Sequence, residues 1–125
     1  MSRVKVENEF LFRASPAILY NFFTTPTCLV RWFCDVVDIQ DDVYTFEWEG
    51  SEEAAELVDD IEEERVRFIW EDADKGEYLE FRMYKSDVTN ETILEIIDFC
   101  DKGEEAENLD YWSTLVDSLK SATGG

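Results

Sequence analysis

Apolar and charged residues alternate along the start of the chain with the two-residue period of a half-buried strand. The alternation runs from Val4 to Phe12 and predicts a strand over residues 2–13, with Asn8 interrupting its apolar face. The same period returns after Asp35, where turn residues divide it into six further strands. The inward residues of these strands are Val37 and Ile39; Tyr44, Phe46 and Trp48; Ala55, Leu57 and Ile61; Val66, Phe68 and Trp70; Leu79, Phe81 and Met83; and Thr92, Leu94, Ile96, Asp98 and Cys100.

Helical patterns occupy two other parts of the chain. Ser15-Pro16 and Thr25-Pro26 each place a capping hydroxyl before a proline, which predicts short helices from Pro16 to about Thr24 and from Pro26 to about Phe33. The last element, residues 104–122, carries one apolar stripe at helical spacing. That stripe consists of Leu109, Trp112, Leu115, Val116 and Leu119.

A helix with a tryptophan on its apolar stripe needs a concave partner, and the strands supply one. The order is strand, two short helices, six strands and a long helix, without an internal repeat or linker. At 125 residues the chain fits a single domain, residues 1–125. We therefore expect an α+β fold in which a curved antiparallel sheet grips the C-terminal helix, with an apolar cavity between them.

Several features of this pattern resemble a known family. Ser15-Pro16, the Trp32-Phe33 pair, the closing strand 92–100 and Trp112 are together similar to the START-like (helix-grip, SRPBCC-type) superfamily, and most of all to small single-domain relatives of the activator of Hsp90 ATPase. The resemblance implies a seven-stranded antiparallel sheet around a long C-terminal helix. It also implies a cavity that holds lipids, sterols, polyketides or other apolar molecules.

The charge of the chain restricts its partners. Thirty-one acidic residues against 11 basic ones give a formal charge of -20, which repels phosphate backbones and anionic membrane surfaces, so no nucleic-acid partner is expected. No apolar run is long enough to span a bilayer, and the first ten residues show no signal-peptide pattern. Three cysteines without CxxC spacing suit reduced thiols, and we expect a cytoplasmic protein.

The chain contains no histidine, which removes most familiar catalytic sites. Ser-His and Cys-His pairs and histidine metal sites are excluded, and Cys28 and Cys34 are too few ligands for zinc. We expect no enzyme activity, no cofactor and no metal. The START-like relatives often carry a histidine near the end of the last strand, where this chain has Asp98. The two-domain arrangement of the eukaryotic chaperone activator is also absent, which argues against a co-chaperone role.

Asp98 is the principal polar candidate, because it shares a strand face with Leu94 and Ile96 and points toward the long helix. A buried carboxylate there would titrate nearer neutral pH and serve as a base. The favoured alternative is that Asp98 lies in water at the strand end, or pairs with an arginine or a helix N-terminus, because burying an unpaired charge is costly.

Large apolar side chains supply the candidate ligand site. In a helix-grip fold they would line the cavity, with indole N–H groups as orienting donors; the alternative is ordinary core packing. The candidate ligand-binding residues are Trp32, Trp48, Trp70, Phe81, Met83, Asp98 and Trp112.

These observations favour a non-enzymatic module that binds a small apolar ligand, lipid-like or aromatic, with the two short helices as a lid. One alternative is a protein interaction module, chaperone-associated or a homodimer joined through a sheet edge or apolar patch. Another is an enzyme of the polyketide cyclase or hydrolase type that uses Asp98 or a tyrosine, which the missing histidine disfavours.

Overall fold

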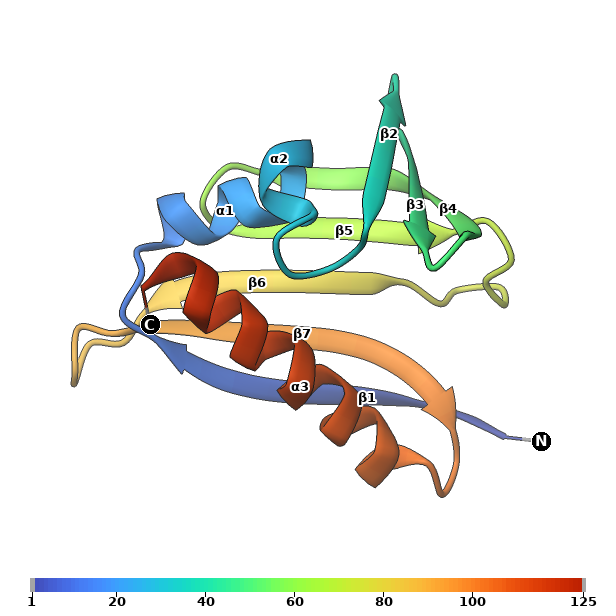
Figure 1. The fold of residues 1–125 in the computed structure, drawn as a ribbon. Coiled ribbons are helices and arrows are strands. Elements are labelled where there is room, and N and C mark those ends of the chain that lie inside the picture. The colour runs from blue at the N-terminus through green and yellow to red at the C-terminus, as the bar shows by residue number, and fades with distance from the viewer. Residues whose placement is uncertain (1, 125) are drawn as a thin grey trace.

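The computed structural model describes residues 2–124, in which a curved seven-stranded antiparallel sheet packs against a long C-terminal helix (Figure 1). The elements in chain order are β1 (Arg3–Phe12), α1 (Pro16–Thr24), α2 (Pro26–Leu29), β2 (Val36–Gln40), β3 (Val43–Trp48), β4 (Ser51–Ile61), β5 (Arg65–Trp70), β6 (Leu79–Lys85), β7 (Thr92–Asp101) and α3 (Glu105–Thr123). The predicted fold class is confirmed.

The strand order is β1-β7-β6-β5-β4-β3-β2, and each neighbouring pair is antiparallel. From β2 onward each strand pairs with the next one in sequence, as short turns allow. The exception is β1, which crosses over to pair with β7. β1 and β2 therefore form the two edges of the sheet, and α3 lies against the inner face beside β1 and β7.

Both short helices begin where the sequence predicts, but α2 ends earlier than predicted. The Ser15 hydroxyl accepts a hydrogen bond from the amide of Ile18, which caps α1. α2 ends at Leu29, four residues before the predicted Phe33, and the chain continues in hydrogen-bonded turns. A regular helix rotates consecutive side chains by about 100°. It would not bury three in a row, as this segment does with residues 32–34.

β4 contains a bulge that changes the prediction for its far end. The register with β5 shifts between Leu57 and Asp59, so that Asp60 instead of Ile61 faces inward. Both residues are exposed, but Asp60 lies opposite the buried Val66 and accepts a hydrogen bond from the hydroxyl of Tyr20, whereas Ile61 lies opposite Arg65 on the outer face. The expectation that Ile61 shares the inner face with Ala55 is therefore wrong, because the extra residue reverses the alternation.

The buried stripe of α3 also differs from the prediction by one position. Trp112, Val116 and Leu119 are buried as expected, but Leu109 is 43% exposed. Its inward place is taken by Asn108, whose side chain bonds to the sheet. The periodic pattern predicts the more apolar Leu109 at the inward position. Asn108 takes that position because Asp98 on β7 supplies a hydrogen-bond partner for its amide.

Aromatic side chains fill the space beneath the middle of α3. Phe23 of α1 stacks on Phe81 of β6, with ring centroids 4.3 Å apart. Trp112 packs edge-on against Phe81 at 5.8 Å and parallel to Phe33 at 6.3 Å. Such contacts stabilise the core beyond simple area burial. The space beneath Trp112 is thus filled, and the open space lies along one side of the helix, beside Tyr111, Leu115 and Ser118.

None of the helices within residues 2–124 is both long and apolar enough to cross a membrane.

Candidate functional site

A groove of about 570 Å³ opens between α3, the segment 30–35 after α2, and the inner face of β3, β4 and β5. Its lining is mainly apolar and aromatic. The lining residues are Val30, Arg31, Trp32, Phe33, Cys34, Asp35, Trp48, Ser51, Glu53, Trp70, Tyr111, Leu115 and Ser118. An adjoining hollow of about 240 Å³ shares Phe33, Glu53, Trp70 and Tyr111 with the groove and reaches Asp98 and Trp112.

The inner face of the sheet supplies one side of the groove. Trp48 of β3 lies opposite Ser51, and Trp70 of β5 lies opposite Ala55. The two indole rings pack against each other, with their centroids 6.3 Å apart. Glu53 lies on the same face of β4, between Ser51 and Ala55, and also lines the groove. This side of the groove therefore consists of an aromatic pair beside one carboxylate.

The segment 30–35 is held rigidly against the opposite side. The indole N–H of Trp48 donates to the carbonyl of Phe33, and the two rings meet edge to face at 5.4 Å. The indole of Trp32 donates to the carbonyl of Phe22 at 2.8 Å. These bonds satisfy buried indole groups and fix the wall that the segment forms.

Tyr111 contributes from α3. Its side chain is 52% exposed, and its ring meets Trp112 edge to face at 5.2 Å. Desolvation raises the pKa of Tyr111, and the nearby carboxylates of Asp98 and Glu53 raise it further. The hydroxyl therefore stays protonated at neutral pH and is available as a hydrogen-bond donor.

The charged groups around the groove are predominantly acidic. Asp35 and Glu53 line it, and Asp72 lines the adjoining hollow. The lining cation is Arg31, which donates to the carbonyl of Ala122 at the end of α3. An acidic rim over aromatic walls disfavours anionic ligands.

Cys34 also lines the groove, and its environment suppresses thiol reactivity. Burial raises the pKa of Cys34 to about 11, and the charge of Asp35 adds to the effect. A thiol of this kind is protonated at neutral pH and is a weak nucleophile. Cys34 therefore acts as a small packing residue of the groove.

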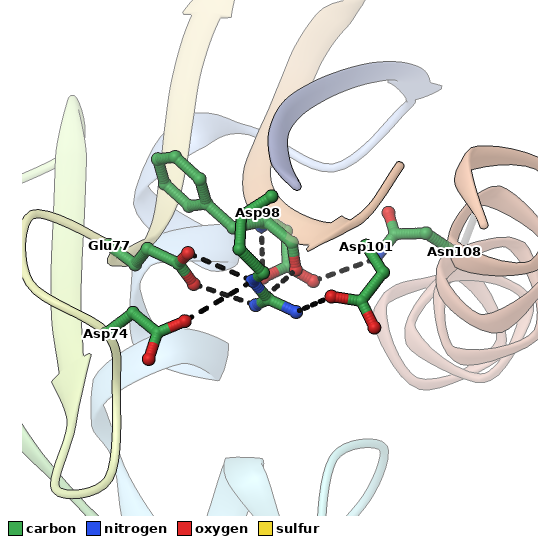
Figure 2. A network of polar contacts seen from close by, with 7 residues as sticks. Asp74, Glu77, Asp98, Asp101 and Asn108 are labelled. Atoms are coloured by element: carbon green, nitrogen blue, oxygen red, sulfur yellow. Dashed lines mark hydrogen bonds and ion pairs between the residues drawn. The ribbon is translucent and has the colours of Figure 1, made fainter. Parts of the chain in front are cut away.

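Asp98 joins the last strand to the long helix (Figure 2). Its Oδ2 accepts a hydrogen bond from the amide of Asn108 at 3.0 Å, which Figure 2 shows. The same oxygen accepts a hydrogen bond from the indole of Trp112 at 2.9 Å. Its Oδ1 accepts from the backbone amide of Phe99 at 2.8 Å. The carboxylate lies between β7 and α3 as expected, and its partners are hydrogen-bond donors of the helix, which satisfy the charge.

A second polar network lies next to Asp98 and fixes the β5–β6 loop. The guanidinium of Arg3 bonds to Glu77 at 2.7 Å and to Asp101 at 3.1 Å, and it also approaches Asp74. Figure 2 shows Asp74, Glu77 and Asp101 converging on this guanidinium. The hydrogen bond from Arg3 lowers the pKa of Glu77. One cation thus ties β1, β7 and the loop beside the groove.

The predicted site residues separate into two groups. Trp32, Trp48 and Trp70 line the groove, and Asp98 and Trp112 line the adjoining hollow. Phe81 and Met83 are buried in the core, away from the groove lining, where Phe81 stacks on Phe23. Their ligand-binding role stays a prediction, and their packing corresponds to the core alternative.

Other groove residues were absent from the sequence-based candidates. Tyr111 and Leu115 come from the helix, and Phe33 and Glu53 come from the opposite wall. Tyr111 lies beside the buried stripe, where periodicity assigns it to solvent. The sequence could have identified Glu53, because it lies two residues before the inward Ala55 and therefore on the same face of β4. Within the described residues, no group of three or more Cys, Asp or Glu side chains is arranged to hold a metal ion.

A curved antiparallel sheet that grips a C-terminal helix, with a groove between them, defines a helix-grip protein. A family model for the START-like superfamily domain matches residues 1–125, so the chain belongs to the START-like superfamily.

Solved structures with the same fold support this assignment. The solution structure of an Aha1 dimer from Colwellia psychrerythraea is similar, with a TM-score of 0.81, 18% identity and 96% of each chain covered. BfR322 from Bacteroides fragilis has a TM-score of 0.71 and 31% identity, over 97% of this chain and 91% of that one. DynU16, from the dynemicin biosynthetic locus, has a TM-score of 0.76 and 17% identity, over 94% of this chain and 46% of that one. No curated protein matches the chain significantly.

Proposed function

We propose that this protein is a non-enzymatic START-like module that binds a small apolar or aromatic molecule in the groove. The observation that carries the proposal is that Trp48, Trp70 and Tyr111 border one open space between the sheet and α3. The groove volume of about 570 Å³ suits such a ligand, since small-molecule sites span about 300–1,000 Å³. Members of the START-like superfamily, to which the chain belongs, commonly bind hydrophobic ligands.

Binding is favoured over catalysis by the state of the polar groups. The Asp98 carboxylate already accepts bonds from Trp112, Asn108 and a backbone amide, so it is committed to holding α3. The buried thiol of Cys34 is held in its neutral form. We assign Asp98 to positioning α3 and Cys34 to packing. The hydroxyl of Tyr111 would orient the ligand as a hydrogen-bond donor.

A lid made of the two short helices would have to open against well-packed contacts. α1 buries Leu19, Phe22 and Phe23 in the core, and the segment after α2 is held by the bonds of Trp32 and Trp48. Val30 and Arg31 are exposed beside the groove. We therefore expect the ligand to enter through the open side of the groove, past these two side chains.

The proposal is tested with a neutral fluorescent probe, N-phenyl-1-naphthylamine, titrated into the purified protein. Tyr111→Ala should weaken probe binding about tenfold, equivalent to about 1.4 kcal/mol. Tyr84→Ala is the matched control, because Tyr84 is 44% exposed on the outer face of β6 and should leave binding unchanged. Ser118→Trp fills the groove from an exposed helix position and should abolish binding while the far-UV circular dichroism spectrum is retained.

Native mass spectrometry of protein purified from its own host supplies an independent test. A co-purified small molecule that is lost from Ser118→Trp supports the groove. Equal probe affinity in wild type, Tyr111→Ala and Ser118→Trp would refute the proposal, as would the absence of saturable binding by wild type.

A further inference from the structure

The two edges of the sheet differ in their charge patterns. Within residues 2–124, β1 pairs with β7 alone and β2 with β3 alone, so each strand has one side without a strand partner. β2 is only five residues long and has Asp38 at its centre, with Asp35, Asp41 and Asp42 just outside its ends. Like charges of this kind protect an edge against pairing with itself. β1 is twice as long and carries both signs of charge.

The backbone of β1 can be assigned residue by residue. The amide of Lys102 donates to the carbonyl of Ser2, and the register places Arg3 opposite Asp101. Antiparallel strands exchange hydrogen bonds at every second residue. Even-numbered residues of β1 therefore bond to β7, and the N–H and C=O groups of Arg3, Lys5, Glu7 and Glu9 point to the open edge.

The side chains of these same odd-numbered residues lie on the exposed outer face, as the alternating burial of β1 shows. A partner strand therefore bonds through them and meets their charges directly. In chain order they read positive, positive, negative, negative. Two strands with this order of charges, paired in antiparallel orientation, can therefore place each positive residue opposite a negative one.

Only certain registers allow two copies of β1 to pair through odd-numbered residues. When the twofold axis passes Val6, Lys5 lies opposite the partner's Glu7 and Arg3 lies opposite the partner's Glu9. An axis at Glu7 sets Glu7 against the partner's Glu7, and an axis at Lys5 sets Lys5 against the partner's Lys5. Opposite charges across a strand pair are favourable and like charges unfavourable, so the charges select the Val6 register.

The side chains on the inner face of β1 are also compatible with this register. On the inner face Val6 meets the partner's Val6, which pairs two half-buried apolar side chains. Figure 1 shows α3 in a separate layer in front of the sheet, with its first turns extending past β1, so a partner strand would join β1 in the plane of the sheet behind these turns.

We propose that two copies of this chain associate through β1 in the antiparallel register centred on Val6, which joins their sheets into one continuous sheet. A second copy fits this edge because the charged residues of β1 lie opposite residues of the other sign when another β1 pairs with it in antiparallel orientation. Arg3 is already held by Glu77 and Asp101. Lys5 and Glu7 form an exposed ion pair within the chain at 3.2 Å, and in the dimer the two such pairs meet as a cluster of four alternating charges, which decides the register.

The test is sedimentation velocity at about 0.15 M salt, where long-range repulsion between two strongly acidic copies is screened beyond about 8 Å. Wild type should show concentration-dependent dimers. Lys5→Glu and Glu7→Lys each place like charges opposite one another and should weaken dimerisation at least tenfold. Lys85→Glu, an exposed residue of β6 with the same charge change, is the control and should dimerise like wild type.

Mixing the two single variants distinguishes this register from any other interface. In the mixed pair both contacts are again between opposite charges, so Lys5→Glu and Glu7→Lys should form a heterodimer although neither dimerises alone. The double variant, with both substitutions in one chain, should dimerise like wild type. A monomeric wild type up to millimolar concentration would overturn the proposal, as would single variants that still dimerise or a mixture that stays monomeric.

Discussion

The indole nitrogen of Trp112 lies 2.9 Å from Oδ2 of Asp98, and this hydrogen bond links the long helix to the last strand. The amide of Asn108 bonds to the same oxygen one helical turn earlier. Two donors from one helix face thus converge on one carboxylate. They set the axial position of α3 on the sheet, and with it the width of the groove that Tyr111 borders.

Asp98→Ala should lower the free energy of unfolding by about 2–3 kcal/mol, because the buried indole of Trp112 and the amide of Asn108 lose a charged acceptor. Urea titration followed by tryptophan fluorescence measures this change. Asp117→Ala, at an exposed position of the same helix, should stay within about 0.5 kcal/mol of wild type. Equal effects of the two substitutions would show that the Asp98 bonds contribute nothing.

The Arg3–Glu77 pair should make stability depend on pH. Because the folded-state pKa of Glu77 is lowered, its contribution is present above the unfolded value, about 4.3, and is lost as pH falls through the folded pKa. Wild type should therefore exceed Glu77→Gln in unfolding free energy by about 0.5–1 kcal/mol at pH 7, and the difference should become smaller at pH 3, which lies below the unfolded value.

Urea titrations at both pH values measure this difference. Glu63→Gln, in the exposed turn after β4, removes the same charge and serves as the control. It should show no such convergence, and a difference between wild type and Glu77→Gln that is unchanged at pH 3 would contradict the assignment.

Glu80 is fully buried on the outer face, where its carboxylate bonds to Arg67 at 2.6 Å and also to Arg82. Tyr78 covers Arg67, with the guanidinium carbon 3.9 Å from the ring centroid. Glu80→Ala leaves two guanidinium groups facing each other and should cost about 3 kcal/mol or more. Thermal unfolding checks this value. Glu56→Ala, on the exposed face of β4, should have little effect, and a similarly small effect for Glu80 would contradict the role of the cluster.

The acidic rim of the groove should select ligands by charge. At low salt, the anionic probe 1-anilinonaphthalene-8-sulfonate should bind about tenfold more weakly than neutral N-phenyl-1-naphthylamine, a difference of about 1.4 kcal/mol. Added salt should narrow the difference, because it screens Asp35, Glu53 and the net charge. Fluorescence titrations at two salt concentrations test this, and tighter binding of the sulfonate would contradict it.

Much of the fold was predictable because strands and helices repeat with short local periods. Alternation located every strand, and Ser15-Pro16 located the start of α1. The errors fall where a distant partner overrides the local pattern. Asp60 turns inward at the β4 bulge to meet Tyr20, and Asn108 replaces Leu109 to meet Asp98.

The candidate site was predictable only in part. Trp70 and Phe81 have the same inward strand pattern, yet Trp70 borders the groove and Phe81 does not. The difference depends on what lies opposite each ring. Phe23 of α1 stacks on Phe81, whereas Trp70 packs against Trp48 of β3 and keeps one side on the groove. Neither neighbour is close in sequence, so no local pattern carries this information.

The sequence by itself determined the number and order of the elements, the inward face of most strands and the excess of negative charge, because each depends on nearby residues or on composition. The tertiary structure decided which aromatic side chains fill the core and which border the groove, what satisfies the Asp98 carboxylate, and that β1 is left at an edge. These outcomes depend on contacts between residues far apart in the chain. The pairing of β1 with β7, made only when the two ends of the chain meet, also decides which backbone groups remain open to a partner.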